Sequence, residues 1–278
     1  MTSARALVGT FALALAAGVA PVQAQDAKKE APKWETSAAA GATISGGNSK
    51  GYQATFGLNS QRKWSKDEVL LGSQAGYGES TKVDRLPSTN PPDNDNHDDV
   101  TTKSDAYAKA FGQWNHLLTD RWFAGVRLDA LHDAVAEVNY RFTLSPLAGY
   151  YFIKNETTSL AVEFGPSLVH ERVAGTEDTY AGVRLAERFQ HKFATGARVW
   201  QSTEIIPQID EFKNFIATSE IGVEAPVSKQ MGIQLKLQHV YDSDPALAGE
   251  IPTGDPGEGK YYKLKNDTKL IGSLTYKF

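Results

Sequence analysis

The residues with the clearest potential for metal chemistry lie in one acidic stretch, 88–99, which reads STNPPDNDNHDD. Carboxylate and amide oxygens are ligands that hard cations such as Ca²⁺ prefer. The stretch lacks the glycine and the distal glutamate of a calcium-binding loop, and its two prolines oppose regular order. We therefore expect a solvated loop and predict no metal or cofactor. The candidate ligands weighed are Asp93, Asn94, Asp95, Asn96, His97, Asp98 and Asp99.

Histidines are the second group that could do chemistry, as part of a hydrolase embedded in a membrane. Such an enzyme needs a serine and a histidine on one face, near the lipid boundary. The GPS triplet at 165–167 is not a nucleophile elbow, and no histidine lies in a recognisable nucleophile pattern. Four histidines instead fall near the ends of predicted strands, where an amphipathic ring suits an interface: His116, His132, His170 and His239. We predict no catalytic residues.

Charged residues on the polar faces of predicted strands are the third group. If the strands close into a barrel with its apolar face outward, these side chains face the lumen. They could line a narrow pore that selects small polar solutes, or pair with one another and fill a small lumen. The sequence leaves both interpretations open. The lumen-facing candidates are Lys63, Arg127, Asp129, Glu163, Glu220, Glu224, Lys236 and Lys269.

The elements that must position these side chains are extended strands, because apolar and polar residues alternate along most of the chain. The segment YQATFGLNSQRKW (52–64) shows this clearly, with aromatic residues near both ends of its apolar face. The composition, with 24 Gly, 12 Phe, 11 Tyr and 5 Trp, is typical of an all-β protein. We predict about twelve strands, near 34–45, 52–64, 68–79, 103–116, 121–132, 138–153, 157–169, 184–193, 198–208, 214–226, 231–242 and 261–278.

The connections favour a membrane barrel over a soluble one. Those after the even-numbered strands are short, whereas three of the others, at 80–102, 170–183 and 243–260, are expected to be long and polar. Short turns on one side and long loops on the other are typical of outer-membrane barrels. A tilted strand needs roughly 9–11 residues to cross the hydrocarbon, and several predicted strands are longer. The fold prediction is an all-β, single transmembrane antiparallel β-barrel.

The N-terminal residues predict export. Arg5 precedes 15 uncharged, mostly apolar residues, and Val22 and Ala24 fit an A-x-A-like cleavage site. We expect a cleaved signal peptide at 1–24, a flexible leader at 25–33 and the outer-membrane barrel at 34–278. The chain has no cysteine, so no disulfide supports it. Its formal net charge of −4 argues against non-specific binding of nucleic acid.

The final strand, LIGSLTYKF (270–278), places apolar residues at every second position. This pattern resembles the assembly signal that the bacterial outer-membrane insertion machinery reads. The expected partners are therefore that machinery and the lipid of the outer membrane. The residues of the expected signal are Leu274, Tyr276 and Phe278.

Four segments together resemble a known family: TISGGNSKGY (43–52), RFTLSPLAGYYF (141–152), YDSDPALAGE (241–250) and KNDTKLIGSLTYKF (265–278). Their order and spacing are similar to those of the YdiY-like family of salt-induced outer-membrane proteins, a domain of unknown function. The similarity extends from about Trp34 to Phe278, with a long insert at 80–102 particular to this chain. The resemblance implies an outer-membrane barrel and a link to salt stress, and it implies no reaction and no catalytic residues.

The sequence leaves three possible functions for this protein. The favoured one is a non-enzymatic outer-membrane barrel, either structural or weakly channel-forming for small polar solutes. The second is an outer-membrane lipid-modifying enzyme, which predicts a Ser–His pair near one rim. The third is a soluble periplasmic ligand-binding barrel, which predicts apolar side chains inside and folding without detergent.

Overall fold

The structure, a computed structural model, describes residues 33–45, 49–85, 97–245, 247–251 and 259–278. The predicted signal peptide, nearly all of the predicted leader and residues 88–96 of the acidic stretch lie outside these ranges. Over the described ranges the chain forms strands and turns. Within them, no helix is long and apolar enough to cross a membrane.

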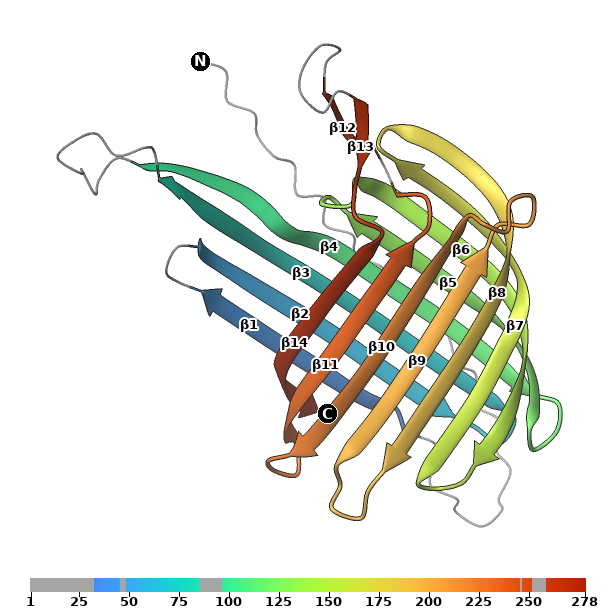
Figure 1. Ribbon diagram of the computed structural model, residues 1–278. Coiled ribbons are helices and arrows are strands. Elements are labelled where there is room, and N and C mark those ends of the chain that lie inside the picture. Colours follow the sequence, from blue (N-terminus) through green and yellow to red (C-terminus); the bar gives the residue numbers. More distant parts are fainter. Residues whose placement is uncertain (1–32, 46–48, 86–96, 246, 252–258) are drawn as a thin grey trace, which may run out of the picture. The chain divides into compact units, whose positions relative to one another are not determined.

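Twelve strands pair with their neighbours into one closed antiparallel barrel, and two further strands, β12 and β13, form a separate two-stranded sheet (Figure 1). The predicted all-β barrel of about twelve strands is therefore confirmed. The strands are β1 (Glu35–Ser45), β2 (Ser49–Lys63), β3 (Asp67–Arg85), β4 (His97–Leu117), β5 (Trp122–Asp133), β6 (Val138–Lys154), β7 (Thr158–Val173), β8 (Thr176–Lys192), β9 (Arg198–Pro207), β10 (Phe215–Pro226), β11 (Met231–Asp242), β12 (Leu247–Ile251), β13 (Gly259–Tyr262) and β14 (Asn266–Lys277).

The barrel closes between its first and last strands. β14 pairs with β11 on one side and with β1 on the other, in a register that joins Ser37 to Lys277 and Ala40 to Leu274. Every strand of the ring therefore has a paired strand on both sides, which matters where water cannot satisfy backbone groups, although β1 pairs with β14 only over Ser37–Ala40.

The prediction of a long loop at 170–183 is wrong. β7 continues to Val173 and β8 starts at Thr176, so the connection is a two-residue hairpin turn. Ala174 and Gly175 have φ values of 49° and 81°, which is the geometry of tight hairpin turns. The polar residues on either side had indicated a loop because no apolar face marks the strands there. Backbone pairing nevertheless continues through them.

The other two expected loops are also partly paired. β3 continues to Arg85 and β4 starts at His97, so most of 80–102 belongs to a long hairpin whose tip lies outside the described residues. The stretch 243–260 contributes β12 and the start of β13.

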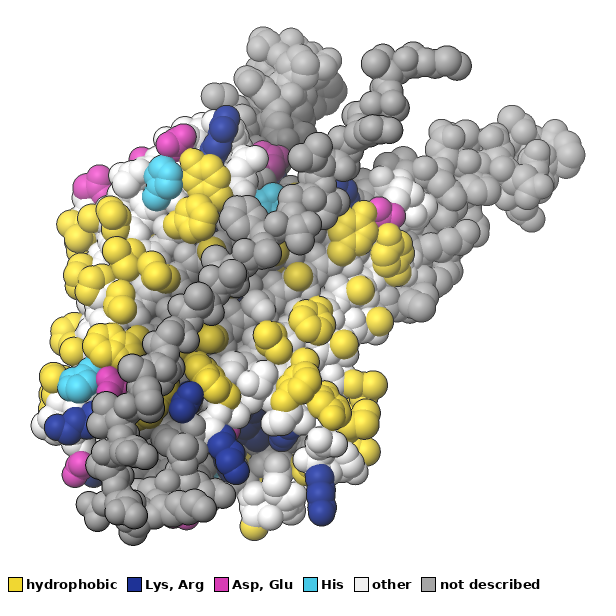
Figure 2. Space-filling view, turned by 180° about the vertical axis from the view of Figure 1, so that it is seen from behind, with side chains coloured by type: hydrophobic (Ala, Val, Ile, Leu, Met, Phe, Trp, Pro, Cys, Tyr) yellow, Lys and Arg dark blue, Asp and Glu magenta, His cyan; other side chains and the backbone are white. Residues whose placement is uncertain are grey.

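Apolar side chains cover the outside of the barrel. Along β6, for example, Phe142 and Leu144 are exposed whereas Thr143 and Ser145 are buried. Figure 2 shows one face on which apolar side chains spread across the middle, with most charged ones nearer the ends. Apolar-out and polar-in is the reverse of the arrangement in a soluble barrel.

A few inward aromatic side chains pack on glycines of the neighbouring strand. Phe123 on β5 is fully buried, and a Cβ added at Gly149 on β6 would lie 2.1 Å from its ring. Phe123 also packs with Leu147, Tyr151 and Ala161 in the small apolar cluster of the interior. The missing glycine side chain thus makes room for a ring inside the barrel.

Candidate functional site: the charged lumen

The eight predicted lumen residues all lie on inward faces, and each forms an ion pair. Their direction follows from their partners, because several pairs join strands that are not neighbours in the ring. Lys269 of β14, for example, lies 2.9 Å from Asp105 of β4. Such contacts are possible only across the interior of the closed barrel.

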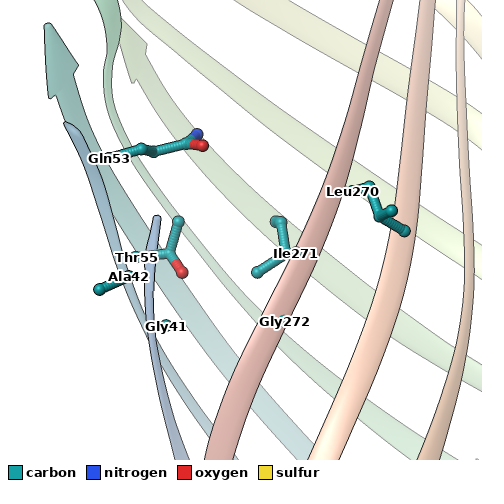
Figure 3. A pocket seen from close by; sticks show the side chains of 7 residues that line it. All are labelled: Gly41, Ala42, Gln53, Thr55, Leu270, Ile271 and Gly272. Carbon is teal, nitrogen blue, oxygen red and sulfur yellow. The ribbon is translucent and has the colours of Figure 1, made fainter. Parts of the chain in front are cut away.

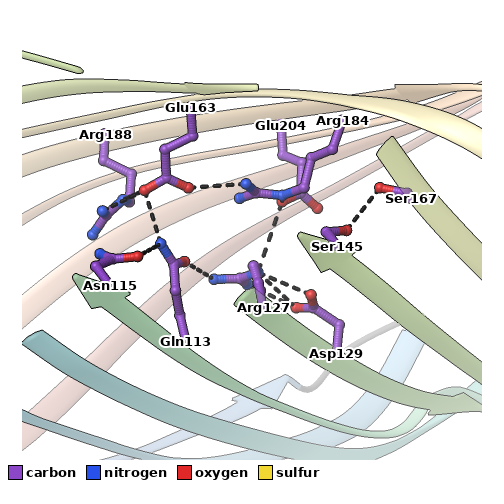
Figure 4. Close-up of polar contacts among 10 residues, drawn as sticks. All are labelled: Gln113, Asn115, Arg127, Asp129, Ser145, Glu163, Ser167, Arg184, Arg188 and Glu204. Atoms are coloured by element: carbon purple, nitrogen blue, oxygen red, sulfur yellow. Dashed lines mark hydrogen bonds and ion pairs between the residues drawn. The ribbon is translucent and has the colours of Figure 1, made fainter. Parts of the chain in front are cut away.

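The largest group is an arginine cluster around Glu163 of β7, whose side chain is fully buried (Figure 4). The Glu163 carboxylate accepts hydrogen bonds at 2.9 Å from Arg184 Nη1, Arg188 Nε and Gln113 Nε2. A carboxylate removed from water requires such partners, because burial strongly disfavours an unpaired charge. Glu163 therefore holds β4, β7 and β8 together through the lumen.

The arginine cluster continues toward β5 and β9. Arg184 Nε lies 2.6 Å from Glu204 of β9, and Arg127 Nη2 lies 2.7 Å from Asp129 Oδ1. Arg127 Nε is also 3.9 Å from Glu204, and Gln113 links Arg127 to Glu163. Three guanidinium groups thus balance three carboxylates, so the cluster narrows this side of the lumen without a large net charge.

A second group, the lysine cluster, lies between β3, β10 and β11. Lys236 Nζ is 3.3 Å from Glu220 Oε2 and 3.0 Å from Gln74 Oε1. Gln238 donates to both Glu220 and Gln74, and Trp200 Nε1 donates to Glu220 at 2.7 Å. These bonds again satisfy the carboxylate.

Lys109 of β4 differs from the other lumen cations. Its side chain is exposed, and within the described part of the chain its ammonium forms no ion pair or hydrogen bond. The charges of Lys236, Lys269 and Arg127 act on it, together with that of Glu220. Lys236, Lys269 and Arg127 are each paired with a carboxylate, so it is the unpaired ammonium of Lys109 that makes this part of the lumen locally positive, which favours a passing anion.

The remaining predicted residues lie near the end with the short turns. Glu224 is 2.8 Å from Arg198 Nη2 and 2.6 Å from Lys277 Nζ. Lys63 is 4.0 Å from Glu68, which also accepts a hydrogen bond from the hydroxyl of Tyr151. These contacts join strands and suit a structural role.

Sequence reasoning missed Lys109, Arg184, Arg188 and Glu204, although the same alternation could have found them. Each lies on the inward phase of its strand, as Glu163 and Arg127 do. The sequence could not show which inward charges meet one another, because the partner across the lumen depends on how the strands are staggered in the closed ring.

A small recess lies between β1, β2 and β14, lined by Gly41, Ala42, Gln53, Thr55, Leu270, Ile271 and Gly272 (Figure 3). A Cβ at Gly41 would lie 2.4 Å from the carbonyl oxygen of Gly272, so the strands approach closely there. No charged side chain lines the recess, and we assign it no ligand.

Metal and hydrolase chemistry find little support in the part of the chain that the structure describes. There, no group of three or more His, Cys, Asp or Glu side chains is placed to hold a metal ion. Of the five histidines whose side chains the structure describes, four bond to a threonine or to a carbonyl oxygen, and His116 bonds to Asp67 at 3.0 Å. Within the same residues, no serine hydroxyl is hydrogen-bonded to a histidine.

The family model for the protein of unknown function DUF481 matches residues 38–278. The chain belongs to the DUF481 family. No curated protein matches the sequence.

Three solved structures with a similar course of the chain are distant in sequence. The NanC porin is 6% identical, with a TM-score of 0.48 over 87% of this chain and 100% of that one. The KdgM porin, solved in complex with disordered oligogalacturonate, is 7% identical, with a TM-score of 0.40 over 88% and 99%. The translocator domain of the autotransporter NalP from Neisseria meningitidis is 10% identical, with a TM-score of 0.39 over 88% and 87%. The barrel assignment rests on the strand pairing.

Proposed function

We propose that this DUF481 protein is a non-enzymatic barrel of the bacterial outer membrane that conducts small polar solutes and prefers anions. The observation that carries the proposal is the orientation of the barrel wall. Large apolar side chains such as Leu128 (58% exposed) and Leu235 (50%) face outward, whereas buried carboxylates and guanidinium groups face the lumen. Only a surrounding of lipid makes this distribution favourable.

The charges of the lumen support a narrow pathway rather than a wide pore. The arginine cluster links β4, β5, β7, β8 and β9 by side chains that meet inside the ring. Paired charges fill space and leave little net potential, so we expect an unpaired cation, Lys109 on β4, to set the selectivity. Fixed charges lining a narrow passage set which ions enter it.

The test is the reversal potential of the refolded protein in a planar bilayer under a KCl gradient. Wild-type protein should show discrete steps and a preference for chloride. Lys109→Glu should weaken or reverse that preference. Lys229→Glu, on the exposed turn between β10 and β11, should leave it nearly unchanged because water and salt screen its charge. A silent bilayer from correctly folded protein would contradict the channel.

The location and assembly of the protein are part of the same proposal. We propose export through a cleaved signal peptide, contact with outer-membrane lipid and insertion through the last strand, where Leu274, Tyr276 and Phe278 are exposed. In cells, Phe278→Ala should lower the amount of heat-modifiable protein in the outer-membrane fraction. Phe212→Ala, on the loop between β9 and β10, serves as the control. Equal amounts of both variants would count against this assembly role.

The salt-induced, YdiY-like role is a proposal that rests on the sequence resemblance alone. Transcript levels that do not rise with external salt would contradict it. The lipid-modifying enzyme and the soluble binding barrel find less support, because the first lacks a Ser–His pair among the described residues and the second requires apolar side chains inside.

A further inference from the structure

The outward wall formed by β8, β9 and β10 carries a group of polar side chains within its apolar surface. We call Glu187, Gln201, Thr203 and Ser219 the polar patch. These three strands lie side by side (Figure 1). The register pairs Glu187 with Thr203, and Thr203 with Ser219, in one row across them.

The phase of each strand shows that the polar patch faces away from the lumen. Trp200 and Glu204, on either side of the β9 members, bond to Glu220 and Arg184 inside the barrel. Residues 201 and 203 therefore point outward, because side chains alternate along a strand. The same alternation places Ser219 outward beside inward Glu220, and Glu187 outward beside inward Arg188.

Three members of the polar patch are bonded to one another. Gln201 Nε2 donates to Thr203 Oγ1 at 2.8 Å, and Thr203 Oγ1 lies 3.3 Å from Ser219 Oγ. Glu187 is the exception. Within the described residues, its carboxylate forms no hydrogen bond or ion pair.

Apolar residues flank the polar patch on both sides along the strands. Leu185 and Ile205, next to Glu187 and Thr203, are 50% and 36% exposed, and Ile221, next to Ser219, is 48% exposed. The patch therefore lies within the surface that lipid covers, away from the headgroups. A carboxylate without a partner is unfavourable in hydrocarbon.

We propose that the polar patch is the contact surface between two copies of this chain in the membrane. The patch contains an acceptor, Glu187, beside donors, the Gln201 amide and the Thr203 and Ser219 hydroxyls. In a two-fold contact the same surface meets itself, so Glu187 of one copy faces donors of the other. On the described strands β8 to β11, alternation turns every lysine and arginine toward the lumen, so this wall supplies no cation for Glu187.

The first test is the mass of the mature protein in detergent micelles and in lipid nanodiscs, by native mass spectrometry. Wild-type protein should have twice the mass of one chain. The triple variant Glu187→Leu, Gln201→Leu and Thr203→Val should have the mass of one chain. The matched control is Ser73→Val, an outward polar residue of β3 on another wall, which should stay dimeric. Wild-type protein of single-chain mass in both media would overturn the proposal.

The second test uses the absence of cysteine in the chain. Thr203→Cys in intact outer membranes should form a covalent dimer with a short bismaleimide, and Ser73→Cys should not. Equal linkage of both variants, no linkage, or linkage of Thr203→Cys only to a protein of another mass would overturn self-association. The proposal rests on insertion in the membrane. A heat-modifiable, membrane-embedded protein that is always monomeric would refute the dimer and leave the proposed channel intact.

Discussion

Glu163 shows how single residues hold the interior together. Its carboxylate is fully buried and joins two arginines and a glutamine from two other strands. A polar group in such a position stabilises the barrel only as long as its partners stay in place, because removing one partner leaves another charge buried alone. The arginine cluster should therefore respond strongly to neutral substitutions that keep the shape of the side chain.

We predict that Glu163→Gln lowers the free energy of unfolding by about 3 kcal/mol, near the lower end of the range for breaking a buried ion pair. The loss is limited because Arg184 still has its second ion-pair partner, Glu204. It should also increase the preference for anions, since the lumen loses a negative charge. Urea unfolding in lipid vesicles and the reversal potential measure the two effects. Glu156→Gln, on the exposed turn between β6 and β7, should change the stability by less than about 0.5 kcal/mol. Equal effects of the two variants would contradict the role of the cluster.

At the scale of strands, the closure between β1 and β14 can be tested directly. Phe278 donates its backbone N–H to the carbonyl of Thr36 at 3.0 Å. Hydrogen-bonded and non-hydrogen-bonded pairs alternate along an antiparallel ladder, so Ala39 and Thr275 form a non-hydrogen-bonded pair. Their Cα atoms should lie about 4.5 Å apart, which a disulfide can bridge.

We therefore expect the double variant Ala39→Cys and Thr275→Cys to form a disulfide on oxidation. The linked chain should migrate differently from the reduced chain on a denaturing gel. Ala39→Cys with Ile271→Cys is the matched control, because the second cysteine lies four residues further along the same strand, about 13 Å away. Linkage in the control alone, or in neither variant, would show that β14 does not close the ring in this register.

The strands also show how far the sequence alone could lead. The alternation of apolar and polar residues predicted about twelve strands, because successive side chains of a strand in the barrel wall point in turn to the lipid and to the lumen. It failed at 170–183, where the strands continue beyond the apolar surface and Ala174-Gly175 makes a tight turn. It named eight charges as candidates for the lumen, and each of them forms an ion pair. It could not predict that Glu163 meets Arg184 and Arg188, because that contact depends on the stagger of the closed ring.

The molecule as a whole is explained by its two surfaces. Over the described residues, the outside is apolar over most of the wall, whereas the inside holds ion pairs and the unpaired Lys109. Lipid on the outside and water on the inside suit these two surfaces. The polar patch on β8 to β10 is the exception, and we propose that a second copy of the chain covers it. Orientation of side chains toward lipid or water is therefore the central claim.

The most direct measurement of that claim compares single cysteines at Leu235 and Lys109 in protein folded into lipid vesicles. The chain has no other cysteine, so each variant carries one label. We predict that a fluorophore on Leu235→Cys is quenched by spin-labelled lipid tails. We also predict that Lys109→Cys reacts with small charged thiol reagents from the water and that its label escapes the lipid quencher. Lipid quenching at position 109, or reaction with charged reagents at position 235, would contradict the orientation of the barrel wall.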